Sequence, residues 1–205
     1  MAYLSPAAEA RFEQEIQKSR FIGIVHPARS PEEVDSLLAG VREEFEDATH
    51  HCWAYLLGDP ERAPRMRFED AGEPAGTAGK PILNVLRNRG IGDALVVVVR
   101  YFGGIKLGAG GLARAYSSTA SRVLDAAELL TAVPRVEMRI RLDYADEAAA
   151  RHLLDRRGIE ILAVSYGDGV LVTAKIAESE TAALSHELSE RTSGRARVEA
   201  RRDGV

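Results

Sequence analysis

Residues 95–123 combine three features that strongly constrain the fold of this chain. Leu95 to Val99 form an apolar run, which is typical of a buried strand. Five glycines follow between positions 103 and 111, and glycine allows positive φ or close approach of another backbone. From Leu112 onward, apolar residues recur with helical spacing. The sequence therefore predicts a strand, a glycine-rich turn and a helix in direct succession.

Three cations accompany this turn: Arg100 precedes the glycines, Lys106 lies among them and Arg114 follows them. The first N–H groups of a helix lack partners and point, with the helix dipole, at one spot, so such a turn can hold an anion. We predict a phosphate- or nucleic-acid-binding surface made by Lys80, Arg100, Tyr101, Gly103, Gly104, Lys106, Gly108, Gly110, Gly111, Arg114 and Tyr116. The turn is neither a Walker loop nor a dinucleotide fingerprint, because no Gly-Lys-Ser/Thr and no suitably spaced acid follow. The alternative is a tight connection whose glycines serve only packing.

The charge distribution supports the binding interpretation. The whole chain has a formal net charge of −4. Residues 80–122 carry seven cations and one carboxylate, whereas residues 1–79 carry 8 cations and 15 carboxylates. A basic block inside an acidic protein is typical of local phosphate binding. Five further arginines, interpreted as a solvated tail, lie near the C-terminus: Arg191, Arg195, Arg197, Arg201 and Arg202.

A second loop is predicted over residues 72–81, which are rich in glycine and proline. Its candidate functional residues are Glu73, Pro74, Thr77 and Gly79. We expect Thr77 to cap a helix that begins near Gly79, with Lys80 close to that helix start. The alternative is a structural crossover packed under the sheet. Asp70 and Glu73 are two carboxylates without a third ligand, which is a poor metal site.

His50, His51 and Cys52 do not make a metal or nucleophilic site. Adjacent strand residues point to opposite faces, and no further cysteine or histidine cluster completes a ligand set. We expect no metal and no cofactor. Tyr101 and Tyr116, which bracket the glycine-rich turn, are the aromatic residues best placed in the sequence to stack on bases.

Four ordered segments resemble the IMPACT family, which is named after a translation-regulating protein of eukaryotes. They are Lys18-Ser-Arg-Phe21, Ala48 to Tyr55, Gly72 to Pro81 and Arg100 to Tyr116. One position departs from the family pattern, since Ala71 stands where a second aspartate is usual. The resemblance implies a ribosomal-protein-like α+β N-terminal domain, similar to domain IV of elongation factor G. It also implies that the domain that follows is similar to the next domain of that factor.

Periodicity independently predicts the second domain. Alternating apolar residues from Val136 to Leu142, a helix over 145–157, strands over 159–166 and 170–176, a helix over 181–190 and a strand over 196–200 give β-α-β-β-α-β. This order is ferredoxin-like. Pro134 marks the boundary, so we expect an α+β protein with domains at 1–133 and 134–205. In the first domain we expect strands at 21–26, 52–57, 66–68 and 95–99, helices at 31–45 and 82–90, and a final helix to about Leu130.

These features favour a non-catalytic regulator of translation in the cytoplasm. A single cysteine, no apolar run of membrane-span length and no signal peptide are typical of a soluble cytoplasmic protein. The expected partner is RNA, the ribosome or a translation-associated protein, without membrane binding or DNA sequence specificity. An enzyme or binder acting on a phosphorylated small molecule or nucleotide is one alternative. A pure protein-interaction module is the other.

Overall fold

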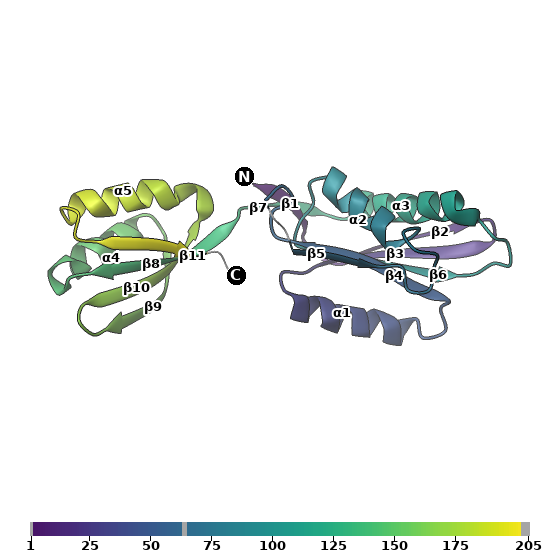
Figure 1. Cartoon of the computed structure of the whole chain (residues 1–205), viewed down its shortest axis with the longest axis horizontal. Helices are drawn as coiled ribbons and strands as arrows, with labels where there is room; N and C mark the ends of the chain where they lie inside the picture. Colours follow the sequence, from purple (N-terminus) through teal and green to yellow (C-terminus); the bar gives the residue numbers. More distant parts are fainter. Residues whose placement is uncertain (1, 63–64, 202–205) are drawn as a thin grey trace. The chain divides into compact units, whose positions relative to one another are not determined.

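The structure, a computed structural model, describes residues 2–62 and 65–201. The chain divides into two compact units, one over Ala2–Ala132 and one from Val133 onward. The first unit is built on an antiparallel sheet of five strands in the order β2-β3-β6-β4-β5 (Figure 1). These strands span Ala10–Ile16 (β2), Ser19–Pro27 (β3), Ala94–Tyr101 (β6), His50–Leu57 (β4) and Arg65–Glu69 (β5).

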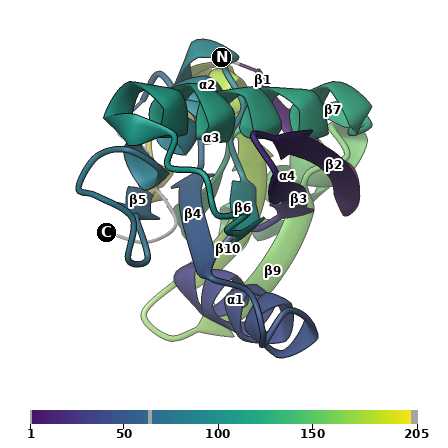
Figure 2. The same ribbon diagram turned by 90° about the vertical axis from the view of Figure 1, so that its right-hand side faces the viewer.

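Helices cover both faces of this sheet. Figure 2 shows α3 (Gly108–Ala126) on one side of β4 and β6 and α1 (Pro31–Glu44) on the other; α2 (Gly79–Asn88) lies on the α3 side. The central strand β6 contributes Val96 and Val98 to the core under α2 and α3, and Val97 to the core under α1. Its continuous apolar run is therefore explained by burial on both faces.

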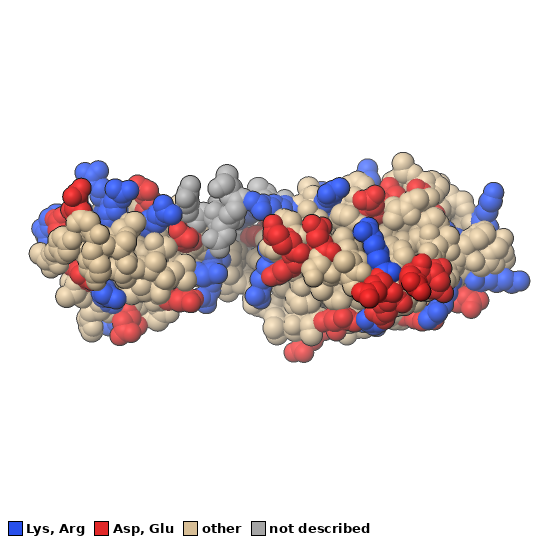
Figure 3. Space-filling view, turned by 90° about the horizontal axis from the view of Figure 1, so that it is seen from below, with Lys and Arg blue, Asp and Glu red and all other residues tan. Residues whose placement is uncertain are grey.

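The helices on the two faces differ in charge. Helix α1 carries five carboxylates and one arginine, whereas α2 and α3 together carry four cations and one carboxylate. Figure 3 looks onto the α1 side, where clusters of Asp and Glu gather. The basic block of the sequence thus lies mainly on the opposite face of the unit. Among the helices of the described residues, none combines the length and apolar character needed to cross a membrane.

Two elements near the ends of this unit were not predicted. Strand β1 (Tyr3–Pro6) pairs with β7 (Leu129–Ala132), and α3 ends at Ala126. The prediction of a helix to about Leu130 was therefore wrong, because pairing with the distant N-terminal segment overrides the helical pattern. Strand β2 was also missed, and it forms a hairpin with β3 through Gln17 and Lys18, both at positive φ.

The second unit is a four-stranded antiparallel sheet in the order β11-β8-β10-β9, with two helices packed on it. Its strands are β8 (Arg135–Leu142), β9 (Glu160–Tyr166), β10 (Val170–Ala177) and β11 (Arg197–Arg201). Its helices are α4 (Glu147–Arg156) and α5 (Thr181–Arg191), preceded by the short 3-10 turns Tyr144–Asp146 and Glu178–Glu180. Met138, Ile140 and Leu153 are among its fully buried core residues. The predicted α+β class and the β-α-β-β-α-β order are confirmed.

Candidate functional site

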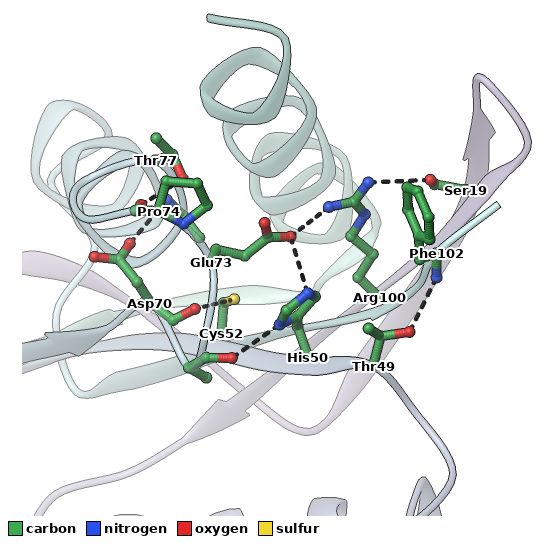
Figure 4. A network of polar contacts seen from close by, with 12 residues as sticks. Ser19, Thr49, His50, Cys52, Asp70, Glu73, Pro74, Thr77, Arg100 and Phe102 are labelled. Carbon is green, nitrogen blue, oxygen red and sulfur yellow. Dashed lines mark hydrogen bonds and ion pairs between the residues drawn. The ribbon is translucent and has the colours of Figure 1, made fainter. Parts of the chain in front are cut away.

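All four segments that carry the family resemblance meet at one end of the five-stranded sheet. Strand β6 is antiparallel to β3 and β4, so its last residues lie beside the first residues of both. In this register Tyr101 is opposite Arg20, and Arg100 is opposite His50. The loop after β5 contacts Arg100 at the same end, as Figure 4 shows. Strand pairing therefore assembles a site from residues far apart in the sequence.

A buried ion pair joins the two predicted loops. Nη1 of Arg100 donates to Oε1 of Glu73 at 2.6 Å, and the side chains are only 5% and 4% exposed. Nη2 of Arg100 donates to the Ser19 hydroxyl at 3.2 Å. The guanidinium also contacts two aromatic rings, at 5.3 Å from the ring centroid of Phe21 and 5.4 Å from that of Phe102. Arg100 thus binds the protein's own carboxylate and is not available to an external anion.

Tyr116 is part of the same internal network. It is fully buried, and its hydroxyl donates to Oε1 of Glu73 at 2.8 Å. The Cys52 thiol lies 3.3 Å from that hydroxyl and 2.9 Å from the carbonyl oxygen of Asp70. Burial raises the pKa of the Cys52 thiol to about 12, and it also raises the pKa of Tyr116. Cys52 is therefore a protonated structural group rather than a nucleophile.

The loop between β5 and α2 is organised by Asp70. Its Oδ2 accepts the N–H of Gly76 at 2.7 Å, and its Oδ1 accepts those of Ala78 and Gly79 at 2.9 and 2.8 Å. The predicted cap, Thr77, instead donates its hydroxyl to the carbonyl of Pro74. The Thr77 prediction was therefore wrong, because a carboxylate at the end of β5 already satisfies the first N–H groups of the helix. Those donors are consequently not free for a phosphate near Lys80.

The glycine-rich turn lies against the β2–β3 hairpin. The N–H of Gly103 donates to the Ser19 hydroxyl, and that of Phe102 donates to the Thr49 hydroxyl. A Cβ at Gly103 would stand 1.9 Å from the Lys18 carbonyl oxygen, so only glycine fits there. Gly104 and Gly108 have φ of +86° and +68°, which also favours glycine. Part of the turn is thus explained by packing and backbone conformation alone.

The predicted binding residues separate into an exposed set and a buried set. The exposed residues are Pro74, Lys80, Gly104, Lys106, Gly108, Gly110 and Arg114. The partly exposed residues are Glu73, Tyr101, Gly103 and Gly111, although the side chain of Glu73 is itself buried. The buried residues are Thr77, Gly79, Arg100 and Tyr116. Surface contact by Arg100 and Tyr116 was predicted from sequence, and their burial rules it out. Tyr101 donates its hydroxyl to Asp47 at 2.7 Å beneath the guanidinium of Arg20. The exposed cations Lys106 and Arg114 and the backbone of the first turn of α3 remain as the candidate contact surface.

Sequence reasoning missed three residues of this site as functional candidates. Ser19 bridges Arg100 and the glycine-rich turn, and Asp70 caps α2. His50 places Nδ1 2.9 Å from the carbonyl of Ala71 and Nε2 3.8 Å from Oε1 of Glu73. Ser19 and His50 lie in segments that carry the family resemblance, which was the only available signal. Among the described residues, no three His, Cys, Asp or Glu side chains are grouped to hold a metal ion.

Comparison with known proteins identifies the family. The Impact N-terminal domain matches residues 17–124, and a domain of unknown function, DUF1949, matches residues 140–195. An IMPACT family member from Haemophilus influenzae is 38% identical over 193 residues, covering 94% of each chain. This chain belongs to the IMPACT family. The IMPACT family member YigZ of Escherichia coli is 35% identical over 94% of this chain and 95% of its own length.

Two further comparisons concern the fold and how much of the chain is shared. A crystal structure described only as that of a hypothetical protein has a TM-score of 0.78 and 34% identity, and covers 99% of this chain and 98% of that one. Protein IMPACT of Mus musculus is 34% identical over 95 residues, which is 45% of this chain and 29% of that protein. The bacterial relatives therefore share both domains with this chain, whereas the match to the mouse protein is confined to part of it.

Proposed function

We propose that this IMPACT family member is a non-catalytic regulator of translation that binds RNA or the ribosome through the exposed surface at the start of α3. Translation is proposed from the family resemblance. The observation that carries the binding proposal is the contrast between the cations of this segment. Arg100 is neutralised inside the unit, whereas Lys106 and Arg114 are exposed and, within the described residues, have no carboxylate partner. Exposed unpaired cations beside a helix N-terminus favour a phosphate ligand.

Gly110 strengthens this proposal, because the fold gives no reason for a glycine there. It lies in the first turn of α3 without positive φ, and an added Cβ would meet only the tip of Arg114 at 3.5 Å. Glycine in a helix costs about 0.5–1 kcal/mol relative to alanine. A ligand that approaches the helix backbone closely would account for the missing side chain.

RNA binding tests the proposal directly. We expect the protein to bind ribosomes or single-stranded RNA with an affinity that falls as salt rises, since counterions are released from the phosphates. Replacing Lys106 and Arg114 together with alanine should weaken binding and make it less salt-dependent. The matched control is Arg87→Ala/Arg122→Ala, which removes two exposed cations of α2 and α3 away from the turn. Equal binding by both double variants would exclude the glycine-rich turn as the contact surface.

Gly110→Ala provides a sharper test, because its effects on stability and binding should have opposite signs. We expect the variant to be as stable as the parent or slightly more stable, and to bind RNA more weakly. Urea unfolding and RNA titration would measure the two effects. Unchanged binding would mean that no ligand approaches the backbone at this position.

The enzyme alternative has little support in the site. Glu73 contacts Arg100 at the start of the glycine-rich turn, but its side chain is buried and already paired with that arginine, so it is a poor general base. Cys52 is buried with a raised pKa.

If neither RNA nor ribosomes bind at any salt, a translation-associated protein becomes the favoured partner of the same exposed surface.

A further inference from the structure

A cavity of about 540 Å³ lies in the second unit, between β8, the start of β11 and the β9–β10 hairpin. Its lining includes Arg141, Ser165, Leu171 and Arg197, and Asp143 and Asp168 also border it. Ligand pockets for small molecules have volumes of roughly 300–1,000 Å³. The cavity is therefore large enough for a nucleotide-sized group, and it lies outside the unit to which the proposed RNA surface belongs.

Strand register places four of the lining residues in a row across the sheet. Arg197 is opposite Arg141, Arg141 is opposite Leu171, and Leu171 is opposite Ser165. In β8 the residues on either side of Arg141, Ile140 and Leu142, are buried in the core. Because side chains alternate along a strand, the row lies on the sheet face away from that core.

Arg141 and Arg197 form a pair of like charges without compensation. Directly opposed like charges destabilise a sheet. Within the described residues, neither guanidinium has a carboxylate within 4.0 Å, whereas Arg139 pairs with Glu137 and Arg195 pairs with Asp146. The C-terminal arginines are exposed, as the sequence predicted for Arg191, Arg195 and Arg197, but they do not form a tail, because Arg191 ends α5, Arg195 pairs with Asp146 and Arg197 begins β11. The side chain of Arg201, and Arg202, lie outside the described residues. An uncompensated arginine pair facing a cavity is an arrangement that an anion would stabilise.

We propose that this cavity binds the phosphate group of a ribose phosphate. Two guanidinium groups can each present two parallel donors to phosphate oxygens, and the Ser165 hydroxyl lies on the same row. Asp168 borders the cavity and, within the described residues, forms no ion pair. Oδ2 of Asp143 lies 3.7 Å from Nε of Arg195. A carboxylate repels a second anionic group and accepts hydrogen bonds from sugar hydroxyls. The site therefore favours a sugar phosphate over an inorganic polyanion. The ribose phosphate is either a free nucleotide or one unit of an RNA chain.

Nuclear magnetic resonance of the arginine Nε–H groups in the full chain would test this site. AMP, inorganic pyrophosphate and a single-stranded oligoribonucleotide serve as probes. We expect saturable shifts of the Arg141 and Arg197 signals with AMP or with the oligonucleotide, and weaker binding of pyrophosphate. Saturation by AMP would identify a nucleotide site, and saturation by the oligonucleotide alone would identify an RNA-backbone site. Absence of saturable shifts with either would overturn the proposal, and so would tighter binding of pyrophosphate.

Two charge-matched double variants give the control. Arg141→Gln/Arg197→Gln should weaken binding about tenfold or more, because hydrogen bonds to charged groups are lost. Arg135→Gln/Arg139→Gln removes two arginines of the same strand that do not line the cavity and should leave the affinity within about twofold. An equal loss of affinity in both double variants would mean that binding depends on overall charge and not on this site.

Two further variants separate this site from its surroundings. Arg197→Glu should abolish binding while raising the melting temperature, since it replaces like charges by an opposite pair; a lower melting temperature would contradict the uncompensated pair. Lys106→Ala/Arg114→Ala should leave the shifts of Arg141 and Arg197 with AMP intact. Failure of the proposed RNA surface and failure of this cavity are therefore distinguishable.

Discussion

Arg100 and Glu73 form an interior ion pair on which several other groups depend. Tyr116 donates to the same carboxylate, and Ser19 accepts from the same guanidinium. Removing one partner of a buried pair leaves an uncompensated charge, which costs about 3–5 kcal/mol. We expect Glu73→Ala to lower the free energy of unfolding by this amount, as measured by urea denaturation followed by Trp53 fluorescence.

Two variants make the Glu73 prediction specific. Glu13→Ala breaks an exposed pair with Arg20 and should cost at most about 1 kcal/mol. Arg100→Met/Glu73→Leu removes both charges and should cost less than Glu73→Ala alone, since no buried charge remains. If Glu73→Ala lowered the free energy of unfolding no more than Glu13→Ala does, Arg100 would not be desolvated.

Two histidines give this unit a predictable dependence on pH. Burial lowers the pKa of both His26 and His51 below the ordinary value for imidazole. The unfolded chain therefore takes up protons at a higher pH than the folded one, and stability must fall as pH decreases through the ordinary histidine pKa of about 6.5. We expect the free energy of unfolding to be fully retained above that pH and to decrease below it.

The His26→Gln variant tests whether histidine protonation causes this pH dependence of stability. It removes one titrating group from the folded interior, so the loss of stability between neutral and mildly acidic pH should be smaller than in the parent. Urea unfolding at a series of pH values would measure it. An unchanged slope would assign the pH dependence to other groups.

At the scale of elements, the glycine-rich turn is held by close backbone contact with the β2–β3 hairpin. A side chain at position 103 would overlap the Lys18 carbonyl, with 1.9 Å between the added Cβ and that oxygen. We expect Gly103→Ala to destabilise the unit by about 1–3 kcal/mol, because the turn or the hairpin must shift. Gly40→Ala is the control, since open space surrounds Gly40 in α1 and alanine is about 1 kcal/mol better in a helix. Thermal unfolding of both variants would reveal the opposite signs, and a harmless Gly103→Ala would contradict the close contact.

At the scale of the whole molecule, each unit has a hydrophobic core of its own. Leu153 belongs to the core of the second unit, whereas Trp53, the single tryptophan, packs in the first. We expect Leu153→Ala to destabilise the second unit by about 2–5 kcal/mol. Circular dichroism should then show an early partial transition while Trp53 fluorescence is unchanged. A common shift of both signals would mean that the two units unfold as one.

The two units correspond to two separate family models. The two family models match separate stretches, residues 17–124 and 140–195. The proposed RNA surface and the proposed phosphate cavity lie in different units. If both proposals hold, the regulator has two phosphate-recognising surfaces on one chain, and binding of an RNA should be weakened by variants in either.

Elements with a local signal could be predicted from the amino-acid sequence. The run at 95–99 indicated a strand, and the alternation of Val136, Met138 and Ile140 indicated β8, because side-chain period follows directly from backbone geometry. The β-α-β-β-α-β order could likewise be predicted from periodicity and turn residues alone.

Which charged residues are exposed and which are paired in the interior depends on contacts between distant segments. Arg100, Lys106 and Arg114 are alike in sequence, yet Glu73 reaches Arg100 across 27 positions and leaves the other two exposed. Asp70 rather than Thr77 caps α2, and strand register sets Arg197 opposite Arg141. Pairing between distant segments depends on how strands align and on which side chains are desolvated together. A local sequence pattern contains neither kind of information. For that reason the sequence could indicate the segments of the candidate site but not which of their side chains are buried and which are exposed.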